Sequence, residues 1–176
     1  MRNLLFLIFC FSMIGLQAQM SCQSHKMISG VNTSSLNNNA KSDTIDILHY
    51  HIQLDASDVS SHHLSARTEI TFVPKMNGVN SISLDLLKLT IDSITPSSLI
   101  NSLSYNDTIL KLNFSASQNI GDSSVISIYY HGTPQTDGSN WGGWHHNPPY
   151  YYNLGVGFAA DPHTYGRAWF PCFDNF

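Results

Sequence analysis

A two-residue alternation of apolar and polar side chains runs through the middle of the chain and restricts its fold more than any other feature. Between residues 45 and 130 the alternation recurs in short segments separated by turn residues. No stretch of a dozen residues keeps the 3.6-residue period of a helix. Because alternation with a period of two places the apolar side chains on one face of a strand, the sequence predicts an all-β fold, an antiparallel β-sandwich.

Five strands are expected from this pattern, each bounded by turn or breaker residues. The first has an apolar face that alternates with histidine and glutamine, and its apolar members are Leu48, Tyr50, Ile52 and Leu54. The others are expected at residues 64–72, 82–91, 110–114 and 125–130. In the third strand the apolar phase changes after Leu86, which predicts a bulge or a sharp bend. The fifth is apolar on both faces, which is typical of a central strand.

The beginning of the chain is expected to be a signal peptide at residues 1–18, followed by a polar linker at residues 19–43. Arg2 precedes an apolar stretch that is too short to cross a bilayer of roughly 30 Å. Cleavage before Gln19 is the expected processing step, and cleavage of a lipoprotein before Cys22 is the alternative. Both predict export, and no other segment is apolar and long enough to cross a membrane.

The charged residues exclude several classes of function. Eight Lys and Arg stand against twelve Asp and Glu, for a net charge of −4. This balance excludes a nucleic-acid surface, which needs clustered cations to displace phosphate counterions. Glu69 is the sole glutamate and has no flanking histidine, so the zinc motif H-E-x-x-H is not within these residues. We therefore expect this chain itself to bind no metal and to contain no catalytic residue.

Aromatic residues are concentrated at the end of the chain. Of the twenty aromatics, eleven fall between Trp141 and Phe176, mixed with Gly, Pro and His. Such a stretch is expected to be irregular. It is interpreted either as a cap over one end of the β-core, because aromatics bury large areas, or as a platform that binds a sugar or a peptide.

Histidine and cysteine raise two further hypotheses. The only mixed cluster of metal-binding types is Asp161, His163 and Cys172. Cys172 could also be a nucleophile with His163 as its base. However, the thiol follows Pro171 in apolar company, which disfavours the reactive thiolate.

The motif at residues 167–174, R-A-W-F-P-C-F-D, resembles the R-x-x-F-P-C-x-D segment of the aminopeptidase N-like zinc metallopeptidases, the gluzincin aminopeptidases. Further segments match in the same order. Residues 49–55 are similar to the family's opening H-Y-x-[IL]-x-L-D strand, and residues 64–72 to its second strand. Leu-Asp-Leu at 84–86 and residues 128–132 are similar to its next conserved steps. The resemblance covers about residues 44–176 and implies the family's saddle-like amino-terminal β-domain.

The closing motif also has a physical interpretation as architecture. Arg167 and Asp174 can bracket the hydrophobic pair Trp169 and Phe170, while Pro171 fixes a bend in the backbone. A desolvated Arg–Asp pair would tolerate no single deletion, because the remaining charge would be stranded. The structural motif that the resemblance implies consists of Arg167, Trp169, Phe170, Pro171, Cys172 and Asp174.

The resemblance further implies a place for substrate binding. In the family, residues just before this motif help to close the pocket for the substrate's amino terminus, usually with Gln or Glu about five residues before the arginine. This chain has Pro162 there, with Asp161 beside it. Asp161 is therefore the substrate-binding candidate, because its carboxylate could pair with a free ammonium group.

For the parent protein, the resemblance implies hydrolysis of peptides from the amino terminus. Zinc held by two His and a Glu would lower the pKa of its bound water to roughly 7, and a G-x-M-E-N segment would grip the terminal amine. Neither motif is in this chain. We therefore expect a domain that is truncated at its C-terminal end, inactive alone, and packed against its own downstream catalytic domain.

Two alternatives belong to other classes of function. One is a stand-alone secreted β-sandwich module that uses its aromatic-rich surface to bind glycan or peptide. The other is a small catalytic protein that uses Cys172 or the histidines.

Overall fold

The computed structural model describes residues 43–55, 57–58, 60–161 and 163–174. The expected signal peptide, nearly all of the expected linker, and Cys22 lie outside the described residues. Of the domain expected at 44–176, residues 56, 59, 162 and 175–176 also lie outside them.

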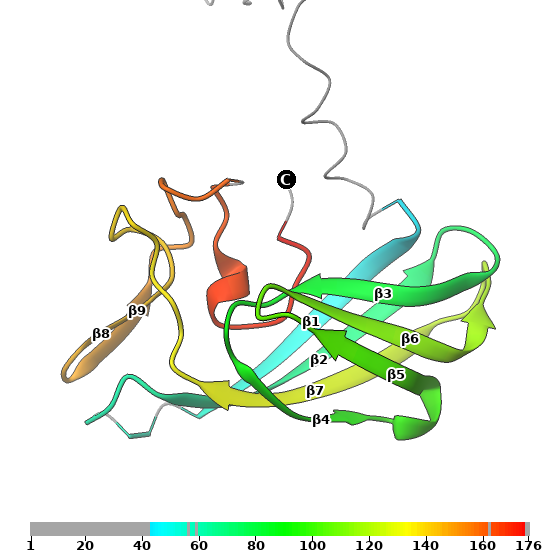
Figure 1. The fold of residues 1–176 in the computed structure, drawn as a ribbon, viewed down its shortest axis with the longest axis horizontal. Helices are drawn as coiled ribbons and strands as arrows, with labels where there is room; N and C mark the ends of the chain where they lie inside the picture. Colours follow the sequence, from blue (N-terminus) through cyan, green and yellow to red (C-terminus); the bar gives the residue numbers. More distant parts are fainter. Residues whose placement is uncertain (1–42, 56, 59, 162, 175–176) are drawn as a thin grey trace, which may run out of the picture. The chain divides into compact units, whose positions relative to one another are not determined.

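Two antiparallel sheets form a sandwich (Figure 1). The four-stranded sheet has the order β1-β2-β7-β4, and its strands are β1 (Ile45–Asp55), β2 (Leu64–Pro74), β7 (Ser124–Gly132) and β4 (Thr90–Thr95). The three-stranded sheet has the order β3-β6-β5, with β3 (Val79–Asp85), β6 (Ile109–Gln118) and β5 (Ile100–Tyr105). The all-β, sandwich-like fold predicted from the sequence is confirmed.

The core lies between the two sheets and is built from their alternating inner faces. In β2 the inner face includes Thr68, Ile70 and Phe72, which are all fully buried. Phe72 stacks on Phe114 of β6, with 5.6 Å between the ring centroids. The other fully buried large side chains are Ile45, Leu64, Ile82, Leu84, Leu86, Leu89, Leu110, Leu112, Ile126, Ile128 and Tyr130. One continuous apolar core therefore joins the two sheets.

Strand β7 is central, as the sequence predicts, because it pairs with β2 on one side and β4 on the other. Its inner face is buried, and the Tyr130 hydroxyl lies 3.0 Å from the Thr68 hydroxyl. Burial raises the pKa of the Tyr130 phenol, so this pair stays uncharged. On the outer face Val125 and Tyr129 are exposed, whereas Ser127 between them is buried. The apolar residues on both faces of this strand predicted its central position correctly, although Val125 and Tyr129 on the outer face are exposed.

Strand β1 departs from the predicted phase. A bulge between Ile47 and His49 adds one residue against β2, which shifts the alternation. Leu48 was expected on the buried face, but it is 56% exposed. Tyr50 and Ile52 keep their predicted inward orientation, whereas Leu54 is exposed where the strand ends.

The third predicted strand is two strands in different sheets. β3 ends at Asp85, and β4 begins at Thr90 after a residue with positive φ, Lys88 at 51°. Leu86 and Leu89 are both buried where the chain crosses. The change of apolar phase therefore marks a crossing between sheets, which is the sharp-bend alternative. Sequence reasoning missed β5 altogether, because Asn and Ser occupy half of this edge strand.

The aromatic-rich segment is more regular than expected. It contains a hairpin of β8 (Trp144–Asn147) and β9 (Tyr150–Asn153), and a 3-10 helix, η3 (Gly166–Ala168), precedes the end of the described chain. Another 3-10 helix, η2 (Ser97–Leu99), leads into β5. Trp144 is buried against the core, and its carbonyl lies 2.8 Å from His62 Nε2. These contacts agree with the interpretation of the segment as a cap.

Candidate functional site

The closing motif is hydrogen-bonded to the end of strand β3. Asp85 and Cys172 exchange two backbone bonds, from Asp85 N to Cys172 O at 2.7 Å and from Cys172 N to Asp85 O at 3.1 Å. The amide of Leu87 also donates to the Arg167 carbonyl at 2.8 Å. Because β3 is an edge strand, these bonds satisfy backbone groups that an edge would otherwise leave open.

The structure brings the two charged ends of the motif together. Arg167 Nη1 lies 3.4 Å from Asp174 Oδ2, and the side chains are only 15% and 4% exposed. The same carboxylate accepts the amides of Gly166 at 3.3 Å and Arg167 at 3.4 Å. One side chain, that of Asp174, therefore accepts from three donors: the Arg167 guanidinium and the amides of Gly166 and Arg167. These contacts tie the end of the motif to η3.

The aromatic residues of the motif join it to strand β1. Trp169 and Phe170 lie 4.5 Å apart between ring centroids, and Phe170 meets the Tyr50 ring edge-on at 5.7 Å. The Phe173 amide donates to the Tyr50 hydroxyl at 3.0 Å. Burial raises the pKa of the Tyr50 phenol, so it remains a neutral partner. The two ends of the family resemblance, residues 49–55 and 167–174, are thus in direct contact.

The cysteine and histidine hypotheses gain no support from this geometry. Cys172 is 3% exposed, whereas His163 is exposed. Within the part of the chain that the structure describes, no three or more His, Cys, Asp or Glu side chains are grouped so that they could hold a metal ion. Asp161, His163 and Cys172 therefore do not form the mixed cluster that their proximity in sequence allowed.

A depression of about 240 Å³ lies beside the closing motif. Its lining residues are Asp85, Leu87, Thr108, Ile109, Asp161 and Arg167. Asp161 is exposed, so its carboxylate is open to solvent in a depression that Arg167 also lines. Its role in binding substrate stays a prediction.

Asp137 organises the segment before Asp161, and sequence reasoning missed it. Its carboxylate accepts the Ser139 hydroxyl at 2.7 Å and the amides of Gly142 and Ala159, both at 2.9 Å. Burial acts to raise the pKa of this carboxyl, but these hydrogen bonds outweigh it and lower the pKa to about 2. The run Asp-Gly-Ser-Asn at 137–140 is turn chemistry, and it is the signal that could have identified the residue.

Close glycine contacts complete this arrangement. A Cβ atom on Gly142 would lie 2.5 Å from the Gly157 Cα atom, and one on Gly157 would lie 3.1 Å from an Asp137 carboxylate oxygen. The two chain segments can therefore approach closely only because both positions lack a side chain. Asp137 and these glycines together fix residues 157–160, which lead directly to Asp161.

No protein-family model matches the sequence, and no curated protein matches it. Solved structures do match. A variant of the M1 zinc metallopeptidase from Deinococcus radiodurans, bound to the substrate Tyr-Ser-Ala, aligns with a TM-score of 0.63 and 20% identity. The same organism's M1 zinc metallopeptidase without the substitution gives 0.60 and 19%. A two-domain M1 zinc metallopeptidase variant bound to L-tryptophan gives 0.61 and 21%.

Each of these matches covers 75% of this chain but only 30% of the other. The chain thus spans less than a third of the length of the structures that it matches. Among the described residues, no helix is long and apolar enough to cross a membrane. The described residues share the fold of one region of the M1 zinc metallopeptidases, and the resemblance seen in the sequence motifs is confirmed at the level of the fold.

Proposed function

We propose that this chain contributes the non-catalytic amino-terminal β-domain of an exported zinc aminopeptidase, which removes residues from the amino terminus of peptides. The observation that carries the proposal is the closing motif, because its ion pair, backbone bonds and rings are all engaged in holding residues 163–174 against the sandwich. The fold likeness to M1 zinc metallopeptidases supports it.

Zinc chemistry belongs, in this proposal, to residues outside the described chain. The described residues supply no group of three ligands, so they do not fit a catalytic zinc site. Their role is to shape one wall of a cleft and to pack against a catalytic domain. We therefore assign this chain no catalytic residue and expect it to be inactive alone.

Asp161 is proposed to bind the free ammonium group of a peptide substrate. Its carboxylate is exposed in the depression beside the closing motif. Arg167, on the same depression, is already paired with Asp174 at 3.4 Å, so it does not need Asp161 as its counter-ion. Asp137 fixes the preceding residues through the Ala159 amide, which limits the positions that Asp161 can take.

Export is proposed from the leader at residues 1–18. Mass spectrometry of the mature protein tests it. A chain that begins at Gln19 is expected, whereas an acylated chain that begins at Cys22 would show the lipoprotein route instead. A protein that retains Met1 and stays in the cytoplasm would contradict export.

The reading frame downstream of the codon for Phe176 tests the main proposal. A continuation that encodes G-x-M-E-N and then H-E-x-x-H is expected. A stop codon at that point, together with a stable secreted product of this length, would contradict the proposal.

The second candidate is a stand-alone binding module, and exposed aromatic side chains favour it. Trp141 is 53% exposed and Phe158 is 59% exposed, and their rings meet edge-on at 5.7 Å. Tyr150 and Tyr152 of β9 are also exposed. Binding of a glycan or peptide that is lost in Trp141→Ala, in a protein with no downstream domain, would support this candidate over the first.

A further inference from the structure

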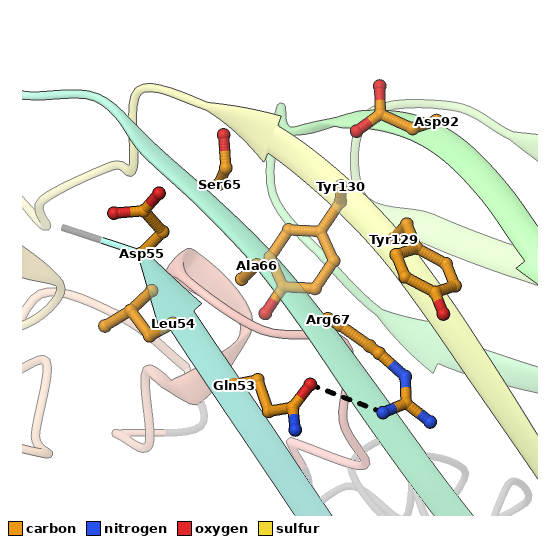
Figure 2. Close-up of a pocket in the computed structure, with 9 residues that line it drawn as sticks. All are labelled: Gln53, Leu54, Asp55, Ser65, Ala66, Arg67, Asp92, Tyr129 and Tyr130. Carbon is orange, nitrogen blue, oxygen red and sulfur yellow. Dashed lines mark hydrogen bonds between the residues drawn. The ribbon is translucent and has the colours of Figure 1, made fainter. Parts of the chain in front are cut away.

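A depression of about 370 Å³ lies on the outer face of the four-stranded sheet, away from the closing motif (Figure 2). This volume is within the range of small-molecule sites. Strands β1, β2 and β7 contribute its lining, and Asp92 of β4 stands at its edge. The lining residues are Gln53, Leu54, Asp55, Ser65, Ala66, Arg67, Asp92, Tyr129 and Tyr130.

The register of the strands explains why this part of the sheet is hollow. Asp55, Ser65 and His131 lie side by side across β1, β2 and β7. Ser65 is the smallest of the three and stands between the longer side chains of its neighbours. Leu54 and Ala66 pair in one row with Tyr130, which is buried on the inner face, so this row closes the floor of the hollow while the polar groups of the neighbouring rows stand around it.

The polar groups around the hollow are held in place by the fold. Arg67 donates to Gln53 Oε1 at 3.3 Å and to Ser127 Oγ at 2.9 Å, and it pairs with Glu69. Its guanidinium carbon lies 5.8 Å from the centroid of the Tyr129 ring, and that residue is still 36% exposed. Asp92 Oδ1 lies 2.7 Å from His131 Nδ1. Groups that are fixed before binding lose little freedom when a ligand arrives.

The charge at this site disfavours an anionic ligand. Arg67 is already matched by Glu69, so the guanidinium adds no net positive charge to the hollow. Asp55 and Asp92 add two carboxylates to the lining. A phosphate or carboxylate would therefore meet net repulsion, and the site is suited to neutral ligands that donate hydrogen bonds.

The placement of the acceptors favours a ring of hydroxyl groups over a single ammonium group. An ammonium group needs oxygen atoms that converge on one point. In Figure 2, Asp55 and Asp92 instead stand on opposite sides of the hollow with Ser65 between them, and Gln53 and Tyr129 lie at other parts of the edge. Carboxylates, an amide and a hydroxyl spread around apolar surface, with an exposed aromatic ring, match a molecule with polar edges and apolar faces.

We infer that this depression is a binding site for a neutral saccharide, with a pyranose ring against Tyr129 and its hydroxyl groups donating to Asp55 and Asp92. This site goes beyond the proposed peptidase function and does not depend on it. It also differs from the aromatic-rich segment that begins at Trp141, because it is lined by other residues. The hairpin β8–β9 lies near the same strand ends, where the Tyr151 hydroxyl donates to the Ser61 carbonyl at 2.6 Å.

Nuclear magnetic resonance titration of the chain with maltotriose, cellotriose and chitotriose tests the inference. At least one of these probes is expected to shift the backbone amides of residues 53–55, 65–67 and 129–131, with a dissociation constant of about 1 mM or lower. Tyr129→Ala is expected to weaken this binding by at least about tenfold, and the isosteric Asp55→Asn variant by a smaller factor. Both positions are exposed, so both variants are expected to fold.

Tyr150→Ala is the matched control, because Tyr150 is an exposed tyrosine of β9, 66% accessible, outside the depression. It is expected to leave saccharide binding unchanged. Three outcomes would overturn the inference: no probe shifts these amides, binding follows Tyr150 instead of Tyr129, or a lysine-rich peptide shifts these amides while all three saccharides fail to do so.

Discussion

The two parts of the described chain, residues 43–132 and 133–174, are held together in different ways. The first part is a sandwich whose strands form long ladders and whose alternating side chains meet in one core. The second part has a single short hairpin. It is held by side chains that bind backbone amides, by close glycine contacts and by aromatic rings in sequence-distant pairs.

Because of this difference, the two parts should lose stability in different ways when one residue is substituted. In the sandwich many similar contacts contribute, and a substitution costs what its own buried volume contributes. In residues 133–174 a few groups each satisfy several partners at once. Asp137 and Asp174 are the clearest cases, since each accepts hydrogen bonds from three groups. Removing one such group should release a whole segment.

The largest effect is expected at the centre of the sandwich. Phe72→Ala removes a fully buried ring that stacks on Phe114 at 5.6 Å, and it should lower the free energy of unfolding by about 3–5 kcal/mol. Urea denaturation followed by circular dichroism measures this. Val125→Ala, on the exposed face of β7, is the control and should stay within about 0.5 kcal/mol. Similar costs for both variants would contradict the described core.

The second effect tests whether one side chain holds the closing motif. Asp174→Ala leaves the Arg167 guanidinium, only 15% exposed, and two amides without their acceptor, which should cost about 3 kcal/mol. In limited proteolysis, cleavage within residues 163–174 should also occur earlier in time than cleavage within the sandwich. Asp46→Ala, an exposed aspartate of β1, is the control. Equal resistance of wild type and Asp174→Ala would show that the motif is held by other contacts.

The third effect separates backbone strain from lack of space. Gly121 and Gly143 have nearly the same φ, 97° and 96°, but a Cβ on Gly121 meets nothing within 4 Å, whereas one on Gly143 would lie 2.0 Å from the Gln135 carbonyl oxygen. Gly121→Ala should therefore cost about 1 kcal/mol for strain alone. Gly143→Ala should cost about 1–3 kcal/mol more. Equal melting temperatures for the two variants would contradict the tight approach.

The smallest and most local effect is a pH transition at Asp137. Its pKa is lowered from the ordinary value of 3.8 to about 2, so its ionised form stabilises the folded segment above the unfolded pKa. That contribution should be lost as pH falls from about 4 through 2. Fluorescence of the nearby tryptophans should report the change, whereas the far-ultraviolet signal of the sandwich should lag behind it. Asp137→Asn should abolish the separate acid step, and an unchanged step in that variant would assign it elsewhere.

The sequence predicted the sandwich better than the aromatic-rich segment, for physical reasons. When one face of a sheet is buried, apolar and polar residues alternate along its strands with a period of two. For this reason β2 and the central place of β7 could be predicted. A bulge moves side chains to the opposite face of the sheet without any change in composition. This is why Leu48 was wrongly predicted to be buried. β5 was missed because an exposed edge strand needs few apolar residues.

The candidate site shows the same limit. The Arg167–Asp174 contact could be expected because both residues flank an apolar run within one motif. The contact between Tyr50 and residues 170 and 173 could not, because it joins positions more than a hundred residues apart. The outer-face depression arises from the register of three strands, and register between distant strands leaves no local signal in a single sequence.

The most direct test of the account is an aminopeptidase assay on the purified chain with added Zn²⁺, using the 4-nitroanilides of alanine, leucine and arginine. The account predicts no hydrolysis above the buffer rate, because the described residues hold no metal-binding group and the chain is proposed to supply only the β-domain. Zinc-dependent release of 4-nitroaniline that persists through repurification and disappears on chelation would contradict it.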